Sequence, residues 1–330
     1  MLIDGEWDPD ATFATDDDGE FDRRPTTFRD RVEADSDAKH PAEADRYHLY
    51  VSLACPWAHR TLIGRSLLGL DGAITVDIVD PIRIDDGWEF TPDRPGCTED
   101  TVNGTSALRE VYLAADDRFT GRVTVPVLWD RTAETIVNNE SIEILRMLDT
   151  AFVEALDLPV TLYPSDLAAE IDAVIEAIYE PINNGVYRAG FAESQAAYEA
   201  AVGDVFDALD YWEDILEHQR YLVGDRFTEA DVCLFTTLIR FDPVYHTHFK
   251  CTKRRIIDYP NLWNYLKELY QVPAIRQTVD FDHIRTHYYA SHNHINPTGH
   301  IAVAPVLPLD EPHDRDRLPA EPVDELALSG

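Results

Sequence analysis

The chain has 330 residues, of which 45% are hydrophobic and 10% aromatic. This composition can bury a full core, which excludes a disordered chain, and the length favours two compact domains. The formal charge of −34, from 62 acidic against 28 basic residues, excludes nucleic acid and anionic membranes as partners, because both attract clustered Lys and Arg.

The cellular location is inferred from the same composition. No stretch approaches the roughly 20 apolar residues of a membrane span, and the first residues lack the basic and apolar regions of a signal peptide. We therefore expect a cytoplasmic protein. So large an excess of carboxylates is typical of a halophile, whose salt screens charge repulsion. An ordinary acidic mesophilic protein is the alternative.

The first elements form a strand-helix-strand unit. Residues 1–45 are rich in Asp, Glu, Pro and Thr without a sustained period, which predicts an irregular acidic arm. Residues 47–52 are β-prone, residues 56–70 have apolar positions at helical spacing, and residues 74–79 read as a second strand. This order is typical of a parallel α/β layer.

A long insertion separates this unit from the rest of the first domain, which we place at residues 46–150. Turn residues and one short helix are predicted in the insertion at 81–122. The elements that follow are two strands and a helix, at 123–130, 134–137 and 141–148. Proline is unfavourable inside a strand, so we expect a cis bond between Val125 and Pro126.

The second domain, residues 160–301, is predicted to be all-helical. Its clearer helices are at 167–179, 195–217, 231–240 and 262–270. Thr228 and Asp231 have the spacing of a helix cap. Residues 302–330 are acidic and rich in proline, which predicts a flexible tail.

Cys55 is the main chemical candidate, because it stands where the first strand turns into the first helix. Unpaired N–H groups at a helix start favour a thiolate, so we expect the pKa of Cys55 below the ~8.5 of a free thiol. Pro56 costs no hydrogen bond at the first helical position. Ala58 replaces the second cysteine of a dithiol motif, so reduction must pass through a mixed disulfide with an outside thiol. A thioredoxin-like domain is therefore expected.

Five segments in the same order resemble the Xi class of glutathione transferases, the glutathionyl-hydroquinone reductases. They are Tyr50–Thr61 (YVSLACPWAHRT), Gly121–Asp130 (GRVTVPVLWD), Ile136–Ser141 (IVNNES), Gly185–Ala192 (GVYRAGFA) and the residues His287-Tyr288-Tyr289, Ser291-His292 and Ile295-Asn296-Pro297. The resemblance covers nearly all of residues 1–302. It implies a thioredoxin-like domain followed by the all-α C-terminal domain of a glutathione transferase.

The resemblance also implies a reaction and a thiol site. Cys55 would attack the sulfur of a glutathionyl-hydroquinone, release the hydroquinone and form a mixed disulfide that a second thiol resolves. Trp88 would pack on the tripeptide, Val125 would pair with its backbone, and Glu140 and Ser141 would hold its γ-glutamyl end. Trp88 as a loop anchor and Ser141 as a helix cap remain the simpler interpretations.

Further roles follow from the same resemblance. Tyr187 and Tyr288 would face the aromatic substrate, with core packing as the alternative. Arg122 is either an anion clamp or, more simply, a solvated side chain. We expect no bound cofactor, glutathione or another γ-glutamyl thiol as cosubstrate, an aromatic hydroquinone conjugate as substrate, and a homodimer.

Several histidines and cysteines outside the predicted thiol site have both a functional and a simpler structural interpretation. Histidines at 246, 248, 283, 287, 292 and 294 suggest a metal at first sight, but no carboxylate or cysteine spacing completes a zinc site, and we expect none. His59 either tunes Cys55 or packs in its helix. Cys233 is expected in the core, and Cys97 is a candidate resolving thiol.

Two alternative functions remain open. A broader thioltransferase acting on mixed disulfides or α-thio-ketones would share Cys55 but not the aromatic pocket. A non-catalytic interaction module with the transferase fold would carry an unreactive Cys55 thiol.

Overall fold

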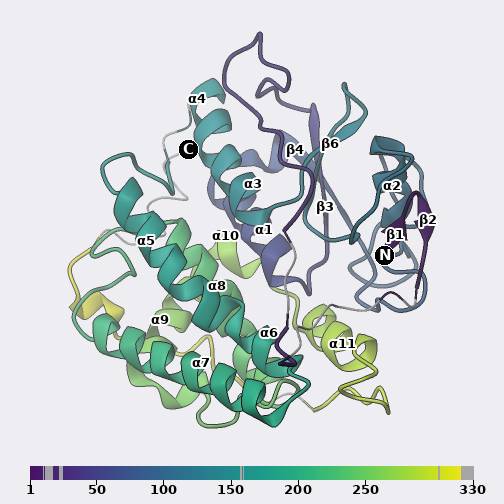
Figure 1. Ribbon diagram of the computed structural model, residues 1–330. Coiled ribbons are helices and arrows are strands. Elements are labelled where there is room, and N and C mark those ends of the chain that lie inside the picture. The colour runs from purple at the N-terminus through teal and green to yellow at the C-terminus, as the bar shows by residue number, and fades with distance from the viewer. Residues whose placement is uncertain are drawn as a thin grey trace.

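The protein is seen in a computed structural model that describes residues 1–9, 11, 18–21, 25–156, 158, 160–303 and 305–320. An α/β domain is followed by a helical domain, which confirms the predicted order (Figure 1). Helix α1 (Pro56–Leu67) lies at the boundary, packed against α8 (Glu229–Arg240) of the helical domain. No helix in these ranges is long and apolar enough to cross a membrane.

The α/β domain contains a four-stranded mixed sheet. Its central strand β3 (Tyr47–Val51) is entirely buried and pairs in parallel with β4 (Ile74–Ile78). On its other side β3 pairs antiparallel with β5 (Val127–Asp130), which pairs antiparallel with β6 (Thr135–Asn138). The crossover helix α1 allows β3 and β4 to run parallel.

Helices cover both faces of this sheet. Helices α1 and α3 (Ser141–Met147) lie together on one face, and α2 (Leu108–Ala115) lies on the opposite side (Figure 1). A Cβ atom at Gly64 of α1 would come within 2.2 Å of Leu145 Cδ1 in α3, so glycine permits this close approach. The Val125–Pro126 peptide is cis, as predicted.

The arm at the N-terminus is attached to the α/β domain. It begins with a small hairpin, β1 (Leu2–Ile3) and β2 (Glu6–Trp7), and is otherwise irregular where it is described. Asp130 at the end of β5 accepts hydrogen bonds from His40 Nδ1 at 2.8 Å and from Arg46 Nη2 at 2.7 Å. A buried carboxylate therefore ties the arm to the sheet.

The helical domain is built around α8, whose twelve residues are all buried, including Cys233. Its N-terminal cap is confirmed, since the Thr228 N–H donates to Asp231 Oδ2 at 2.8 Å. The other helices are α4 (Val153–Leu156), α5 (Ala168–Ile178), α6 (Gly185–Gly190), α7 (Gln195–Leu216), α9 (Pro260–Gln271), α10 (Pro273–Arg276) and α11 (Phe281–Ser291). Three π-helical segments are η2 (Leu148–Phe152), η3 (Tyr179–Asn183) and η4 (Phe241–Tyr245). Three 3-10 turns are η1 (Leu70–Gly72), η5 (Ile256–Asp258) and η6 (Arg315–Arg317).

The segment after residue 302 differs from the flexible tail that its composition predicts. In its described part, residues 305–320, Arg315 is fully buried and donates to the carbonyls of Leu216, Gln219 and Arg220 at 2.6, 2.6 and 2.8 Å. Gln271 at the end of α9 also donates to the carbonyls of Leu309 and Glu311 at 2.7 and 2.8 Å. The segment is therefore anchored to α7 and α9 by contacts that composition does not reveal. Residues 321–330 lie outside the described ranges.

Candidate active site

A cavity of about 710 Å³ lies where the α/β domain, the arm and the helical domain meet. All eight residues predicted for the site line it, although they come from segments far apart in the chain: Cys55, Trp88, Arg122, Val125, Glu140, Ser141, Tyr187 and Tyr288. The chain therefore brings together a thiol, two phenols, a carboxylate and basic groups around one space.

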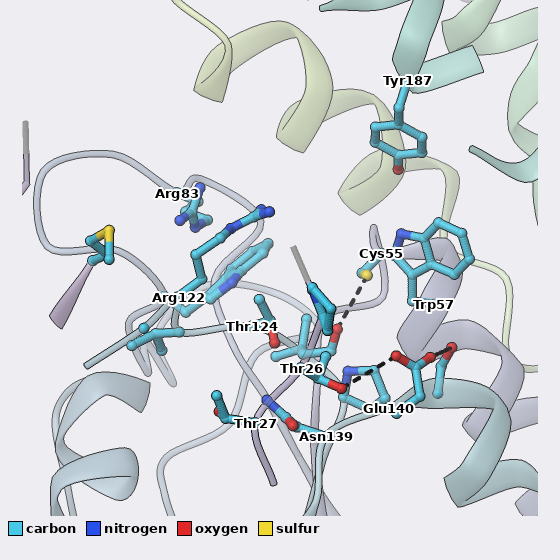
Figure 2. Close-up of a pocket in the computed structure, with 18 of the residues that line it drawn as sticks. Thr26, Thr27, Cys55, Trp57, Arg83, Arg122, Thr124, Asn139, Glu140 and Tyr187 are labelled. Atoms are coloured by element: carbon cyan, nitrogen blue, oxygen red, sulfur yellow. Dashed lines mark hydrogen bonds between the residues drawn. The ribbon is translucent and has the colours of Figure 1, made fainter. Parts of the chain in front are cut away.

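Cys55 occupies the N-cap position of α1, with extended backbone angles of φ −78° and ψ 122°. Its side chain is half-buried, and Sγ contacts the Val125 carbonyl at 3.6 Å. Figure 2 shows the sulfur beside Trp57, with the Tyr187 hydroxyl directed toward the same space. The thiol thus combines a helix-start position with access to the cavity, as a nucleophile requires.

Polar groups at the start of α3 form one end of the cavity. The Glu140 carboxylate accepts from Thr26 Oγ1 of the arm at 3.4 Å, and Ser141 Oγ lies 3.5 Å from its other oxygen. Ser141 is buried, at 2% exposure, in the first turn of α3. A carboxylate beside unpaired helix-start N–H groups suits an α-amino acid head, which carries both charges.

Val125 and Trp88 also line the cavity. Val125 precedes β5, and its N–H has no hydrogen-bond partner among the described residues. The Trp88 indole stacks on His287 of α11 with ring centroids 5.0 Å apart. The site thus offers a free main-chain donor beside an apolar wall.

Arg83 joins Arg122 at the basic end of the cavity, and the sequence analysis missed it (Figure 2). The pKa of the Arg83 guanidinium is lowered, because burial outweighs the opposing interaction with Cys55. The pKa of the Met1 amino group is also lowered. Burial is the largest cause, the charge of Arg83 comes next, and the charge of Arg122 has a smaller effect. Positive charge therefore collects here in a chain of net charge −34. Arg83 belongs to no motif, and only its place in the insertion hinted at a role.

The side facing the helical domain is aromatic. The Tyr187 hydroxyl of α6 hydrogen-bonds to that of Tyr288 in α11, which in turn lies 2.9 Å from the Tyr245 hydroxyl. Burial raises the pKa of both Tyr288 and Tyr245 well above 10, so these phenols stay protonated. Tyr245 was not predicted, because nothing in its local sequence distinguishes it from a core tyrosine.

Three histidines, His248, His287 and His292, pack near these tyrosines. His248 Nε2 and His292 Nδ1 lie 3.2 Å apart. Burial lowers the pKa of His248 to about 4, that of His287 to about 3 and that of His292 well below 6.5. Within the described ranges no three His, Cys, Asp or Glu side chains are grouped to hold a metal ion.

The other cysteines lie away from the cavity lining. All four cysteines are in the described part of the chain, and no disulfide joins them. Cys97 Sγ contacts the Val79 carbonyl at 3.8 Å, and burial raises its pKa, as it does for Cys233 and Cys251. No contact between Cys97 and Cys55 supports a resolving role.

Comparisons with known proteins point in one direction. The N-terminal domain of glutathione S-transferases matches residues 54–151, and their C-terminal domain matches residues 195–268. The chain is 52% identical to glutathionyl-hydroquinone reductase YqjG of Escherichia coli, covering 96% of this chain and 98% of that protein.

Solved structures agree with this. The Xi-class glutathione transferase of Natrialba magadii is 54% identical, has a TM-score of 0.91 and covers 97% of this chain and 98% of its own. The glutathione-bound structure of Escherichia coli YqjG gives a TM-score of 0.87 at 50% identity, over 96% of this chain and 99% of its own.

Proposed function

The chain belongs to the glutathionyl-hydroquinone reductases, the Xi class of glutathione transferases, and on this basis we propose that Cys55 is its nucleophile and that the cavity holds a thiol and an aromatic ring side by side. The observation that carries the proposal is the position of Cys55. Its sulfur lies at a helix start and opens into a cavity with a polar end at Glu140 and two phenols at Tyr187 and Tyr288.

The reaction proceeds in two thiol-exchange steps. In the first, the Cys55 thiolate attacks the sulfur of an S-conjugated hydroquinone, so that an S–S bond forms and the bond from sulfur to the ring carbon breaks. The ring carbon gains a proton, which reduces the aromatic part, while the cysteine becomes a mixed disulfide. In the second step another thiol attacks that disulfide, leaves as the oxidised dimer and restores Cys55.

The thiol binds across the α/β domain. Glu140 and Ser141 hold its γ-glutamyl head, the Val125 N–H pairs with its backbone, and Trp88 packs against its apolar surface. The support is the half-buried carboxylate at the start of α3, the unused N–H before β5 and the stacked indole. Arg122 provides charge at the opposite, basic end.

The cosubstrate is glutathione or another γ-glutamyl thiol, with no resident cofactor. Glutathione binds in the solved structure of the 50% identical Escherichia coli protein. The basic end, with Arg83 beside Arg122, suits a second carboxylate, which any γ-glutamyl thiol carries. Turnover with several low-molecular-weight thiols identifies the preferred one.

The hydroquinone ring lies on the helical side, against Trp57 and the phenols of Tyr187 and Tyr288. Aromatic side chains supply stacking area, and neutral phenols can donate to a quinol oxygen. We further propose that the enzyme is a homodimer in the cytoplasm. Light scattering tests the homodimer, for which the measured mass should be twice the 37.5 kDa of one chain.

Replacing Cys55 tests the proposed chemistry. Cys55→Ser is nearly isosteric, but a hydroxyl is not a thiolate nucleophile, so hydroquinone release should fall at least about a thousandfold while the melting temperature stays close to that of the wild type. Turnover of a glutathionyl-hydroquinone and of a simple mixed disulfide is measured on both proteins. Substantial residual turnover in Cys55→Ser would rule out the mechanism, and a wild-type preference for the simple disulfide would favour a general thioltransferase.

A further inference from the structure

Arg240, the last residue of α8, has a fully buried side chain that crosses the domain boundary. Its Nε donates to the Ala54 carbonyl at 2.9 Å, and its Nη2 donates to the Leu53 carbonyl at 3.0 Å. These two residues directly precede Cys55. The helical domain therefore holds the peptide that leads into the nucleophile.

The third guanidinium nitrogen of Arg240, Nη1, is also hydrogen-bonded. Nη1 donates to the Thr236 carbonyl of α8 at 2.8 Å and to His59 Nδ1 at 3.0 Å. Because His59 accepts at Nδ1, its Nε2 carries the proton and donates to Thr278 Oγ1 at 2.8 Å. Burial, and then the charge of Arg240, lower the pKa of His59 well below 6.5. His59, one turn after Cys55, thus serves this network as a neutral ring.

The positive charge of Arg240 is not cancelled locally. Among the described residues its polar contacts are carbonyl oxygens and one neutral imidazole, with no carboxylate. Arginine keeps its charge at every accessible pH. Burial raises the pKa of Tyr288, and the Arg240 charge opposes that effect, so its field reaches the cavity.

We propose that Arg240 is a positioning residue: it locks the Leu53–Ala54 peptide so that the Cys55 sulfur keeps its place at the start of α1, and its uncompensated charge favours the thiolate. Without the guanidinium the Ala54 carbonyl would be buried without a donor, and this cost keeps the peptide on Arg240. This inference rests on the proposed function only in taking Cys55 as the nucleophile.

Other charged or titratable groups line the same cavity as Cys55. They are the Met1 amino group, Arg29, Arg83, Arg122, Glu140, Tyr179, Tyr187, His287, Tyr288 and His292. All ten are retained in the variants below, so a change in thiol reactivity reports on Arg240.

The test compares Arg240→Met and Arg240→Lys with a matched control, Arg315→Met. Arg315 is equally buried and also donates to three main-chain carbonyls, but at the end of α7. The alkylation rate of Cys55 by iodoacetamide is followed against pH in the full chain, with modified peptides quantified by mass spectrometry. Melting temperature and hydroquinone turnover are measured on the same samples.

We expect Arg240→Met to move the alkylation midpoint upward by about one pH unit and to lower turnover about tenfold or more. Arg240→Lys keeps the positive charge but loses the planar set of guanidinium donors. Its alkylation midpoint should therefore match that of the wild type, while its turnover should stay reduced. Arg315→Met should lose thermal stability and keep the wild-type midpoint.

Two results would overturn the proposal. One is a wild-type midpoint and wild-type turnover in Arg240→Met, or in Arg240→Lys if the methionine variant does not fold. The other is an equal midpoint shift in Arg315→Met, which would show that Cys55 reactivity responds to any destabilisation of the fold. Alkylation needs no hydroquinone, so a chain with the expected midpoints but no hydroquinone turnover would contradict the proposed function alone.

Discussion

Tyr187 and Tyr288 present hydroxyl groups at the same cavity as Cys55, one on a half-buried and one on a buried side chain. Both the reduction of an aromatic conjugate and the exchange of a small mixed disulfide need Cys55. Only the former uses a hydroxyl at a quinol oxygen. One lost hydrogen bond is worth on the order of 0.5–1.5 kcal/mol, or about two- to tenfold in rate.

We therefore expect Tyr187→Phe and Tyr288→Phe to lower aromatic reduction relative to disulfide exchange by about two- to tenfold. The ratio of the two activities is measured in each variant. Tyr198→Phe is the control, since its hydroxyl donates to the Lys250 carbonyl outside the cavity lining. Equal losses of both activities would assign the two tyrosines to the fold or to the thiol site.

At the scale of elements, the end of β5 should control the attachment of the arm. Burial raises the pKa of Asp130, but the hydrogen bonds from Arg46, His40 and the following N–H groups outweigh it and lower the pKa to about 2. An unfolded aspartate has a pKa of about 3.9. The stabilisation is therefore complete above about pH 4 and is lost as the pH falls toward 2, for a total on the order of 2 kcal/mol.

The corresponding experiment compares unfolding of the wild type and Asp130→Asn between about pH 2 and pH 6. The difference in unfolding free energy between the wild type and Asp130→Asn should be largest at the highest pH and should shrink as the pH falls. Asp282→Asn is the control, because the Asp282 side chain is 93% exposed. A difference that does not change with pH would mean that the Asp130 charge does not hold the arm.

For the whole molecule, the charge of −34 should make stability depend on salt. Repulsion among 62 carboxylates opposes the compact state, and about 1 M salt shortens the screening length to roughly 3 Å. We expect the melting temperature to rise by on the order of 10 °C from about 0.2 to about 3 M KCl. Sucrose at matched osmolality separates screening from general stabilisation. A melting temperature that is highest in dilute buffer would favour the ordinary acidic protein.

The sequence alone determined the features that depend on neighbours in the chain. Cys55 before Pro56 marks a strand turning into a helix, and Thr228 with Asp231 marks the cap of α8, because such junctions follow from local backbone chemistry. The order of the domains followed from apolar periodicity and from the family resemblance. The eight predicted site residues do line one cavity, but this grouping rested on the resemblance rather than on spacing.

Only the tertiary structure decided which distant groups meet. Arg240 lies 186 positions from the Ala54 carbonyl it binds, and Tyr245 lies 43 from its partner Tyr288. Arg83 and the anchoring of the last described segment by Arg315 were missed for the same reason. The role of a buried arginine or tyrosine depends on the polar atoms that folding places around it. These atoms belong to no local pattern in the sequence.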